Sequence, residues 1–161
     1  MNSTLNSFTQ ITDGSFELQA SDNLNSSYIT RPDTAKANFR IVEDAKEAYH
    51  GRKFLDLTAQ AGDWWGISQK IKLKPNKKYT TTFYIKGDSV EMHCGAFNSG
   101  KFLGWNNAMI PEEKWQKVSY DFYTDSTNAN TTIYIAVNHS SQNVKIQIDK
   151  LEVVQELPQN N

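Results

Sequence analysis

Asp63-Trp64-Trp65-Gly66-Ile67-Ser68-Gln69-Lys70-Ile71-Lys72-Leu73 is the stretch that decides the fold. Positions 67, 69, 71 and 73 hold isoleucine, glutamine, isoleucine and leucine, and the positions between them hold serine or lysine. This period of two is typical of a β-strand with one buried face, because successive side chains of a strand point to opposite faces. Two adjacent tryptophans cannot both enter one core from such a strand. The stretch therefore predicts a sheet protein with one indole packed inside and the other at a surface.

Strand parity assigns the two tryptophans to different faces. Trp65 shares the face of Ile67, so we expect it in the core, whereas Trp64 shares the face of Lys70. A β-bulge at Gly66 would exchange the two roles, and that alternative stays open at this point. An exposed indole is costly to leave in water, so the surface tryptophan is typical of a site that binds something flat and partly apolar.

The same alternation recurs along most of the chain. Short runs rich in β-branched and aromatic residues are separated by turn signals such as Pro75-Asn76, Gly87-Asp88 and Ser99-Gly100. The predicted strands are Ser15–Leu18, Asn38–Val42, Lys53–Ala59, Gly66–Leu73, Lys78–Lys86, Val90–Phe97, Gln116–Thr124, Thr131–Asn138 and Val144–Val154. About nine short strands without helices between them predict an all-β fold, an antiparallel β-sandwich.

The length of 161 residues fits one domain with a core that needs no cross-links. We expect the sandwich to occupy residues 11–155, with residues 1–10 as a tail or linker and residues 156–161 as a linker. Cys94 is the single cysteine, so no internal disulfide can form. It shares a face with apolar neighbours, as a small buried side chain would.

Charge and hydropathy argue against two classes of partner. The formal net charge is −1 and the pI is about 6.3, so there is no electrostatic basis for binding nucleic acid or an anionic membrane. No apolar run approaches the roughly 18 residues that span a bilayer. Loops rich in Asn, Ser and Thr, with sequons at Asn2, Asn25, Asn130 and Asn138, are typical of an exported protein, so we expect an extracellular location.

No catalytic motif is recognisable in the sequence. The histidines lie on separate segments without metal-ligand spacing, and there is no nucleophile elbow, phosphate loop or paired-carboxylate motif. The residues therefore favour a binding domain over an enzyme.

Four segments, taken in chain order, carry a resemblance to a known family. They are Asp13-Gly14-Ser15-Phe16-Glu17, the turn and strand Ala48–Leu57, the strand pair Gly66–Lys86, and an ending that combines Trp115–Val118 with Ile148–Val153. In this order they resemble the jelly-roll carbohydrate-binding modules grouped as families four, nine and twenty-two, over about residues 12–154. The resemblance implies a jelly roll of about nine strands that binds carbohydrate.

The resemblance also implies a structural calcium ion. Members of these families commonly hold one between a carboxylate of the first strand, main-chain carbonyls near the Gly-Lys turn and a carboxylate before the last strand. The corresponding residues here are Glu17, Asp149 and the carbonyls around Gly51 and Lys53. Calcium takes about six to eight oxygen ligands, which two carboxylates, carbonyls and water can supply. The alternative is that both carboxylates are solvated or paired with Lys53 and Arg52.

A sugar site built on aromatic platforms is the further implication of the resemblance. The family's platform tryptophan corresponds to Trp64 or Trp65, and the tyrosine of its penultimate strand corresponds to Tyr134. Xylan-binding relatives carry a glutamate two residues beyond that tyrosine, where this chain has Ala136, which argues against a xylan-like ligand specifically. Trp105 is either a second platform or a loop anchor. Hydrogen bonds to sugar hydroxyls would come from the polar candidates, which are Asn138, Glu91, His93 and Gln69.

Together with the lack of catalytic motifs, the resemblance implies a non-catalytic carbohydrate-binding module. It would bind a plant or microbial polysaccharide of the β-glucan, xylan or mannan type, as a monomer, and would target an attached glycoside hydrolase. Two alternatives stay open, because jelly rolls host unrelated functions. One is a structural or protein-binding β-sandwich accessory domain of a larger extracellular enzyme, and the other is a small polysaccharide-degrading enzyme.

Overall fold

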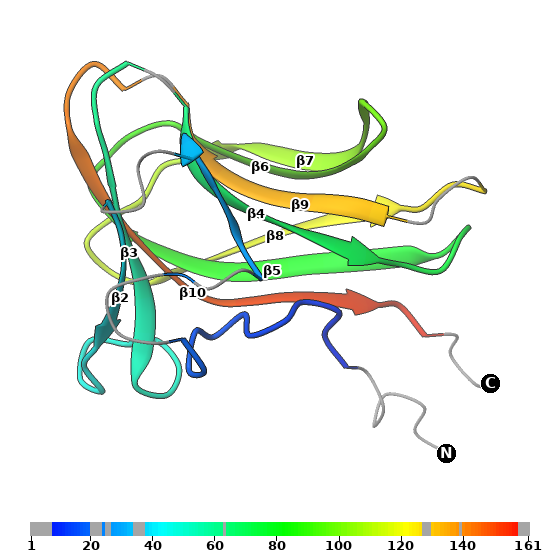
Figure 1. The fold of residues 1–161 in the computed structure, drawn as a ribbon, viewed down its shortest axis with the longest axis horizontal. Helices are drawn as coiled ribbons and strands as arrows, with labels where there is room; N and C mark the ends of the chain where they lie inside the picture. Colours follow the sequence, from blue (N-terminus) through cyan, green and yellow to red (C-terminus); the bar gives the residue numbers. More distant parts are fainter. Residues whose placement is uncertain are drawn as a thin grey trace.

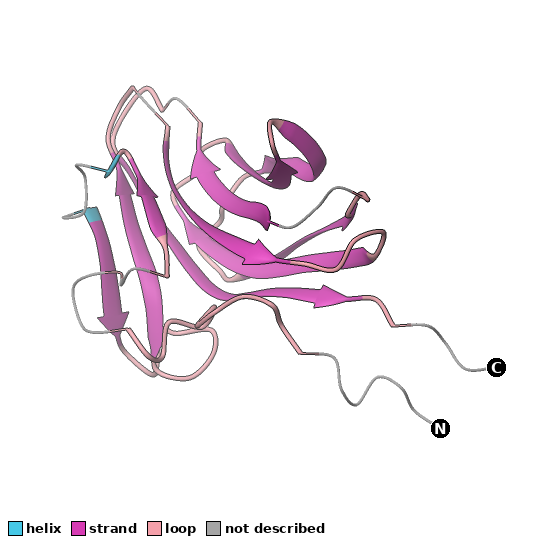
Figure 2. Cartoon of the chain, turned by 45° about the vertical axis from the view of Figure 1, so that its right-hand side comes forward, coloured by secondary structure: helices cyan, strands magenta, loops and turns pink. Residues whose placement is uncertain are grey.

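The computed structural model describes residues 8–19, 24, 27–33, 38–62, 64–126, 130–138 and 140–157. The predicted sequons at Asn2 and Asn25 and the ends of both predicted tails lie outside these residues. Within them, ten antiparallel strands form two five-stranded sheets (Figures 1 and 2). None of the described residues belongs to a helix with the length and hydropathy needed to cross a membrane. The predicted all-β antiparallel sandwich is therefore confirmed.

The front sheet has the order β1 (Ile29–Arg31), β4 (Trp65–Lys72), β9 (Asn130–Val137), β6 (Met92–Asn98) and β7 (Lys101–Met109). The back sheet has the order β2 (Phe39–Glu43), β3 (Lys53–Ala59), β10 (Val144–Gln155), β5 (Lys78–Gly87) and β8 (Gln116–Tyr123). Most neighbours in each sheet are distant in sequence, so the fold depends on long-range pairing.

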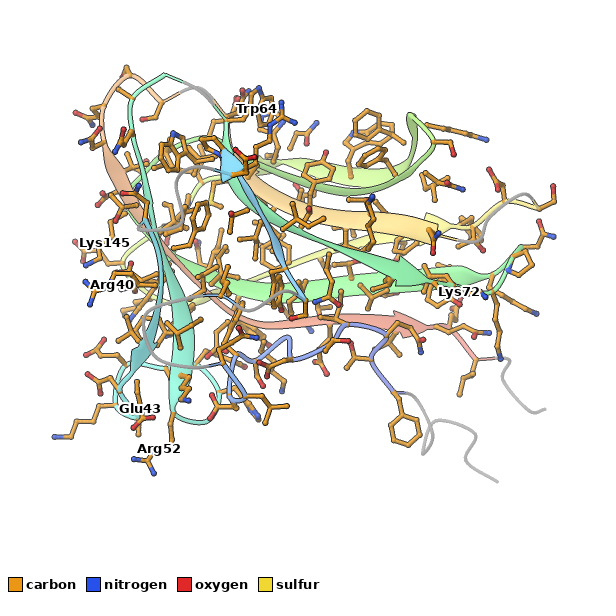
Figure 3. The ribbon with its side chains drawn as sticks, viewed as in Figure 1. Arg40, Glu43, Arg52, Trp64, Lys72 and Lys145 are labelled. Atoms are coloured by element: carbon orange, nitrogen blue, oxygen red, sulfur yellow. The ribbon has the colours of Figure 1, made fainter. Side chains whose placement is uncertain are left out.

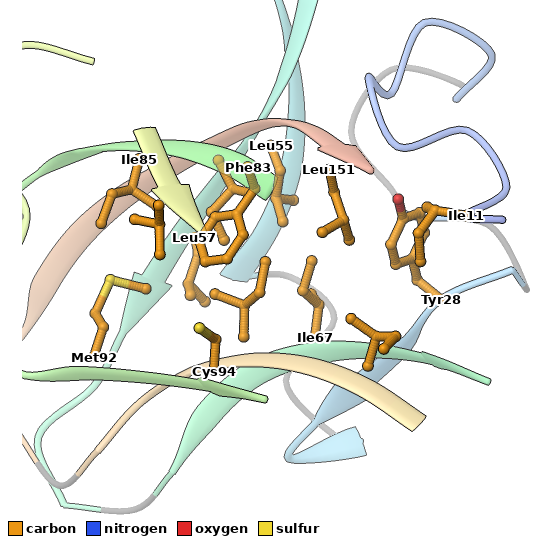
Figure 4. Close-up of a cluster of buried hydrophobic side chains, with 14 of the residues drawn as sticks. Ile11, Tyr28, Leu55, Leu57, Ile67, Phe83, Ile85, Met92, Cys94 and Leu151 are labelled. Carbon is orange, nitrogen blue, oxygen red and sulfur yellow. The ribbon is translucent and has the colours of Figure 1, made fainter. Parts of the chain in front are cut away.

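The core fills the space between the two sheets. Inward-facing side chains alternate with outward-facing ones along each strand, as the period of two predicts. In β5, for example, Tyr79, Phe83 and Ile85 are each at most 1% exposed. Figure 4 shows side chains of the back sheet, such as Phe83, meeting Ile67 and Cys94 of the front sheet. The apolar face of each sheet is thus covered by the other.

The predicted strand Ser15–Leu18 is wrong, because this segment is a turn. Asp13 organises it: its carbonyl oxygen accepts a hydrogen bond from the Phe16 amide at 3.1 Å, and its Oδ1 accepts one from the Leu18 amide at 3.1 Å. Asp13 and Phe16 both have positive φ angles, of 50° and 62°. Aspartate side chains commonly compete in this way with strand pairing.

Two strands were missed by sequence alone. β1 has three residues, too few to show a period. β7 contains glycine and asparagine, which are depleted in strands, and was expected to be a connection. The remaining predicted strands are confirmed, with shifts at their ends.

The N-terminal segment runs beside β10, as Figure 1 shows. The Gln10 amide donates to the Val153 carbonyl at 2.7 Å, and the Leu151 amide donates to the Gly14 carbonyl at 2.9 Å. A Cβ atom on residue 14 would stand 1.7 Å from the Leu151 carbonyl oxygen, so only glycine allows this approach. The contact brings the segment that follows Gly14 up to the last strand.

Candidate functional site

A groove of about 490 Å³ lies on the outer face of the front sheet. All the strands of that sheet contribute to its lining, together with Trp64, which directly precedes β4. Successive side chains of a strand point to opposite faces. The side chains that alternate with the core-facing ones therefore point toward the groove. The same pattern that builds the core therefore also determines which side chains face the groove.

Two small residues flank Tyr134 across the sheet. Ser68 of β4 pairs with Tyr134 of β9, which pairs in turn with Gly95 of β6. A Cβ atom on Gly95 would stand 3.0 Å from the Tyr134 hydroxyl oxygen and 2.8 Å from the Gly104 carbonyl oxygen. The absence of a side chain at Gly95 therefore lets the tyrosine lie across the neighbouring strand.

Aromatic rings from β6, β7 and β9 form one wall. The ring centroids of Phe97 and Phe102 are 5.9 Å apart, and Tyr134 contacts both edge-on at 6.4 and 6.3 Å. Trp105 contacts Phe102 at 6.3 Å, and the two are 57% and 54% exposed. Edge-to-face packing is a favoured ring geometry, so the rings support one another. An exposed aromatic cluster of this kind is typical of a binding surface.

Trp64 stands at the other end of the groove. Figure 3 shows it at the opposite end of β4 from Lys72. Its indole meets the His93 ring edge-on, with centroids 5.3 Å apart. His93 Nε2 lies 2.9 Å from Glu91 Oε2, and Asn138 Nδ2 donates to the same oxygen at 3.0 Å. A polar cluster therefore lies directly beside the indole.

The electrostatics of that cluster favour a charged carboxylate. Hydrogen bonds from His93 and then Asn138 hold the pKa of Glu91 below its ordinary value. Asn138 Oδ1 is buried and has no hydrogen-bond partner among the described residues. The cluster thus combines a fixed carboxylate, an imidazole and a carboxamide, which are the planar polar groups that can hold hydroxyls beside a flat ring.

Cations line the side of the groove opposite the aromatic wall. Arg31 of β1 and Lys70 of β4 are both exposed, and both line the groove. Arg31 pairs with Gly66 and Ile29 with Ser68, so Ile29 lies between the two cations along the direction of β4. Arg31 lies in the row of Gly66, near Trp64, and Lys70 lies four residues further along β4.

The structure excludes two predicted site residues from the groove. Trp65 is 6% exposed and stacks on Phe39 at 6.1 Å, which confirms the parity prediction that it packs in the core. The register of β4 with β9 is continuous from Trp65 to Lys72, so there is no bulge at Gly66. Gln69 is 3% exposed; its side chain accepts from the Thr12 amide at 2.8 Å and donates to the Thr12 carbonyl at 3.0 Å. The side chains of Trp65 and Gln69 therefore face the core and support the fold.

The other predicted ligand residues lie on or beside the groove. Trp64 and Tyr134 line it, while Glu91, His93 and Asn138 lie next to Trp64, and Trp105 lies next to Phe102. Their contact with a ligand stays a prediction.

Phe102 and Arg31 were not among the predicted site residues. Phe102 follows a Ser99-Gly100 turn between alternating runs, which is a hairpin signal that could have identified it. No comparable signal marks Arg31, because β1 is so short.

The residues of the expected calcium site meet at the turn before β3. Glu17 accepts hydrogen bonds there, at Oε1 from the Arg52 amide at 2.9 Å and at Oε2 from the Lys53 amide at 2.8 Å. A Cβ atom on Gly51 would stand 2.5 Å from Glu17 Oε1, so the glycine makes room for the carboxylate. Asp149 Oδ2 accepts from the amide of His50 in the same turn at 2.9 Å.

These contacts allow a test of how well a cation would fit. Burial, followed by the nearby charge of Glu17, raises the pKa of Asp149 to about 6. Both carboxylates accept hydrogen bonds from backbone amides, namely those of His50 and Lys150 for Asp149 and those of Arg52 and Lys53 for Glu17. Each carboxylate has about four acceptor sites, so lone pairs remain. Two acidic groups with free lone pairs suit calcium chemically.

A second hollow, of about 540 Å³, lies beside the chain ends. Its lining includes Phe8, Lys72, Lys74 and Pro75. Tyr79 also lines it, but this residue is 1% exposed and belongs to the core. It therefore lacks the set of facing rings found in the groove.

Comparison with known families gives one match that covers most of the chain. The model of a family described as a carbohydrate binding domain matches residues 9–143. This span includes β1 to β9 and all the residues that line the groove. No curated protein matches the chain.

Several solved structures share the fold. "Family 16 Carbohydrate Binding Module-2" is similar with a TM-score of 0.63 and 18% identity over 90% of this chain and 99% of that one. TmCBM61 in complex with β-1,4-galactotriose has a TM-score of 0.66 and 13% identity over 92% and 99%. A cyclase from Fischerella sp. TAU in complex with 4-(1H-indol-3-yl)butan-2-one has a TM-score of 0.71 and 15% identity over 96% and 99%. At such identities these likenesses show a common fold.

Proposed function

The chain belongs to the carbohydrate-binding domain family, and from this membership we propose that its groove binds a polysaccharide chain without cleaving it. The observation that carries the proposal is the arrangement of Trp64 and Tyr134 in one groove with Phe97 and Phe102. Flat rings can cover the C–H faces of sugar rings and so bury apolar surface. Glu91 and His93 lie beside the indole, where they can bond to sugar hydroxyls.

The proposed ligand is a plant or microbial polysaccharide of the β-glucan, xylan or mannan type. Ala136 lies in the groove lining where xylan-binding relatives carry a glutamate, so xylan is the weakest of these candidates. The ligand of TmCBM61, β-1,4-galactotriose, adds galactan to the polymers worth testing.

The free energies of these contacts predict a modest affinity for the polysaccharide. Covering a ring face contributes on the order of 1–2 kcal/mol at about 25 cal/mol per Å². Hydrogen bonds add about 1 kcal/mol each, and both terms must offset the entropy of association. The result is a Kd in the micromolar to millimolar range, or roughly −4 to −8 kcal/mol.

A non-catalytic role is supported by the charges near the groove. Glycoside hydrolysis needs two carboxylates about 5–9.5 Å apart across the sugar. The described residues that line the groove include none, and Glu91 beside it is held by His93 and Asn138. We therefore assign the domain an accessory role, as an extracellular monomer that brings an attached glycoside hydrolase to its substrate.

A structural calcium ion is part of the proposal. Glu17 and Asp149 would hold it, with main-chain groups around Gly51 and Lys53. Support comes from the raised pKa of Asp149, because a divalent cation would offset the burial and the repulsion that raise it.

Affinity electrophoresis against β-glucan, xylan, mannan and galactan tests the function. We expect retardation of the native protein by at least one polymer, with no release of reducing ends. Trp64→Ala should abolish the retardation, whereas Tyr123→Ala, an exposed aromatic on the back sheet, should not. Native retardation of Trp64→Ala would refute the proposed site, and lack of retardation by every one of these polymers would refute the proposed type of ligand.

A further inference from the structure

We propose that the groove recognises a polysaccharide that carries anionic groups, either uronate carboxylates or sulfate esters. The inference rests on the proposed function that the groove binds a polysaccharide, and within that class it favours an anionic chain over the neutral β-glucan and mannan types. It comes from the charges of the groove lining: Arg31 and Lys70 are the charged residues there, and both are cationic. The chain as a whole has a net charge of −1, so this local excess is not a consequence of a basic protein.

Neither cation is neutralised by a described carboxylate. Some lysines of the described residues form ion pairs, as in Lys86 with Glu47 at 3.0 Å and Lys145 with Asp56 at 3.3 Å, and others, such as Lys114, have no carboxylate partner among these residues. Arg31 and Lys70 have no such partner in the part of the chain that the structure describes, and both are exposed. An unpaired cation at the edge of a binding groove is available for a charged ligand.

The spacing of the two cations favours a chain over a single sugar. Arg31 pairs across the sheet with Gly66, and Lys70 is four residues further along the same strand. Four residues of a strand cover about 13 Å of backbone, so two different sugar residues of one chain can meet the two side chains. Anionic groups on different residues of one polymer would meet both cations.

The two walls would then act on different parts of the ligand. The rings of Phe97, Phe102 and Tyr134 offer apolar faces on the β6–β7 side, and Arg31 and Lys70 offer donors on the β1–β4 side. A guanidinium can hold a carboxylate or a sulfate through two parallel hydrogen bonds, and an ammonium acts as a point charge.

The carboxylate nearest the groove does not cancel this charge. Glu91 lies beyond Trp64, outside the lining, and its Oε2 is engaged by His93 and Asn138. It would repel an anionic group placed beyond Trp64, so the anionic substituents should sit between the row of Arg31 and that of Lys70.

Isothermal titration with defined polymers tests the inference. The uronate arm is polygalacturonate and alginate, the sulfate arm is carrageenan, and the neutral arm is β-glucan, mannan and galactan. We expect tighter binding to at least one anionic arm than to every neutral polymer, with affinity that falls as NaCl is raised from about 0.05 to 0.5 M. The arm that binds identifies the anionic group.

Charge-neutral variants locate the effect. Arg31→Gln combined with Lys70→Gln should weaken anionic binding roughly five- to tenfold and remove most of its salt dependence, at an unchanged melting temperature. Lys114→Gln, an exposed lysine on the β7–β8 connection, is the matched control and should bind as the native protein does.

Two outcomes would overturn the inference, and they differ in what they say of the function. Equal or tighter binding of a neutral polymer, lost in Trp64→Ala but kept in the double variant, overturns the anionic ligand and leaves the polysaccharide function intact. Lack of binding to every polymer in all arms overturns both.

Discussion

Trp64 and Trp65 are consecutive in the chain, but their indoles lie on opposite sides of the front sheet. Trp65 is 6% exposed and stacks on Phe39 of the back sheet at 6.1 Å. Trp64 lines the groove and contacts His93 at a centroid distance of 5.3 Å. Since the register of β4 is continuous, alternation alone separates them. One tryptophan therefore holds the two sheets together, and its neighbour is available to a ligand.

This division predicts that the two alanine substitutions lower stability by very different amounts. Trp65→Ala should lower the free energy of unfolding by about 3–5 kcal/mol, because it leaves a cavity between the sheets. Trp64→Ala should lower it by less than about 1 kcal/mol, since a half-buried surface ring leaves no enclosed cavity. Urea denaturation of both variants measures the difference, and equal losses would contradict the assignment.

Two substitutions at Tyr134 can separate the contribution of its ring to binding from that of its hydroxyl group. Its ring joins the aromatic wall, with Phe97 and Phe102 edge-on at 6.4 and 6.3 Å. Tyr134→Phe keeps that ring and should leave polysaccharide affinity within about twofold of native, whereas Tyr134→Ala should reduce it roughly tenfold. Isothermal titration gives both values. Equal losses in the two variants would mean that the hydroxyl, and not the ring, binds the ligand.

Calcium should stabilise the domain through Glu17 and Asp149. A ligand that binds the folded state raises stability by mass action, so millimolar calcium should raise the melting temperature and a chelator should lower it, by about 2–4 °C per kcal/mol. Glu17→Gln should abolish the difference. Glu43→Gln is the matched control, because Glu43 lies nearby and pairs with Arg52 at 3.7 Å without being a proposed ligand. Identical melts of the native protein in calcium and in chelator would exclude the ion.

Glu91 should make a pH-dependent contribution to the free energy of unfolding. Its hydrogen bonds with His93 and Asn138 hold its pKa below the ordinary value of 4.5, so the folded state favours the charged form. The contribution is therefore fully present above about pH 5 and is lost as the pH falls through the lowered folded-state pKa. The difference in unfolding free energy between native protein and Glu91→Gln should therefore shrink as the pH is lowered below about 5. A difference that is flat down to pH 3 would contradict the prediction.

Cys94 should be chemically inert in the folded protein. It is 0% exposed, and burial raises the pKa of its thiol to about 12. Because the thiolate is the reactive form, the native protein should not react with Ellman's reagent at pH 8. The protein unfolded in guanidinium should release one equivalent of chromophore. Rapid reaction under native conditions would show that the front sheet opens readily around β6.

The strands that local sequence predicts well are those with a clear period of two. β5 and β8 alternate over their whole length, and both were identified because one face of each packs in the core. β7 was missed since its glycine and asparagine residues disguise a strand that is stabilised by pairing with β6. Ser15–Leu18 failed for the opposite reason: its residues suit a strand, but the Asp13 side chain closes a turn instead.

Only part of the groove could be predicted from the sequence. Parity separated Trp64 from Trp65, and the same rule places Gln69 on the inner face with Ile67, where the structure finds it bonded to Thr12. The contacts among Glu91, His93 and Asn138 could not be foreseen, because they join the start of β6 to the end of β9.

Local alternation settled that the chain is an antiparallel sandwich and that adjacent tryptophans serve different faces, because backbone geometry alone fixes where successive side chains point. Only the tertiary structure decided which strands lie side by side. Placing β9 between β4 and β6 brings Tyr134 into the same groove as Trp64 and Phe97, and pairing β1 with β4 brings Arg31 to its edge. These pairings join segments that are distant in sequence, and they are selected by burial of the shared core rather than by any local signal.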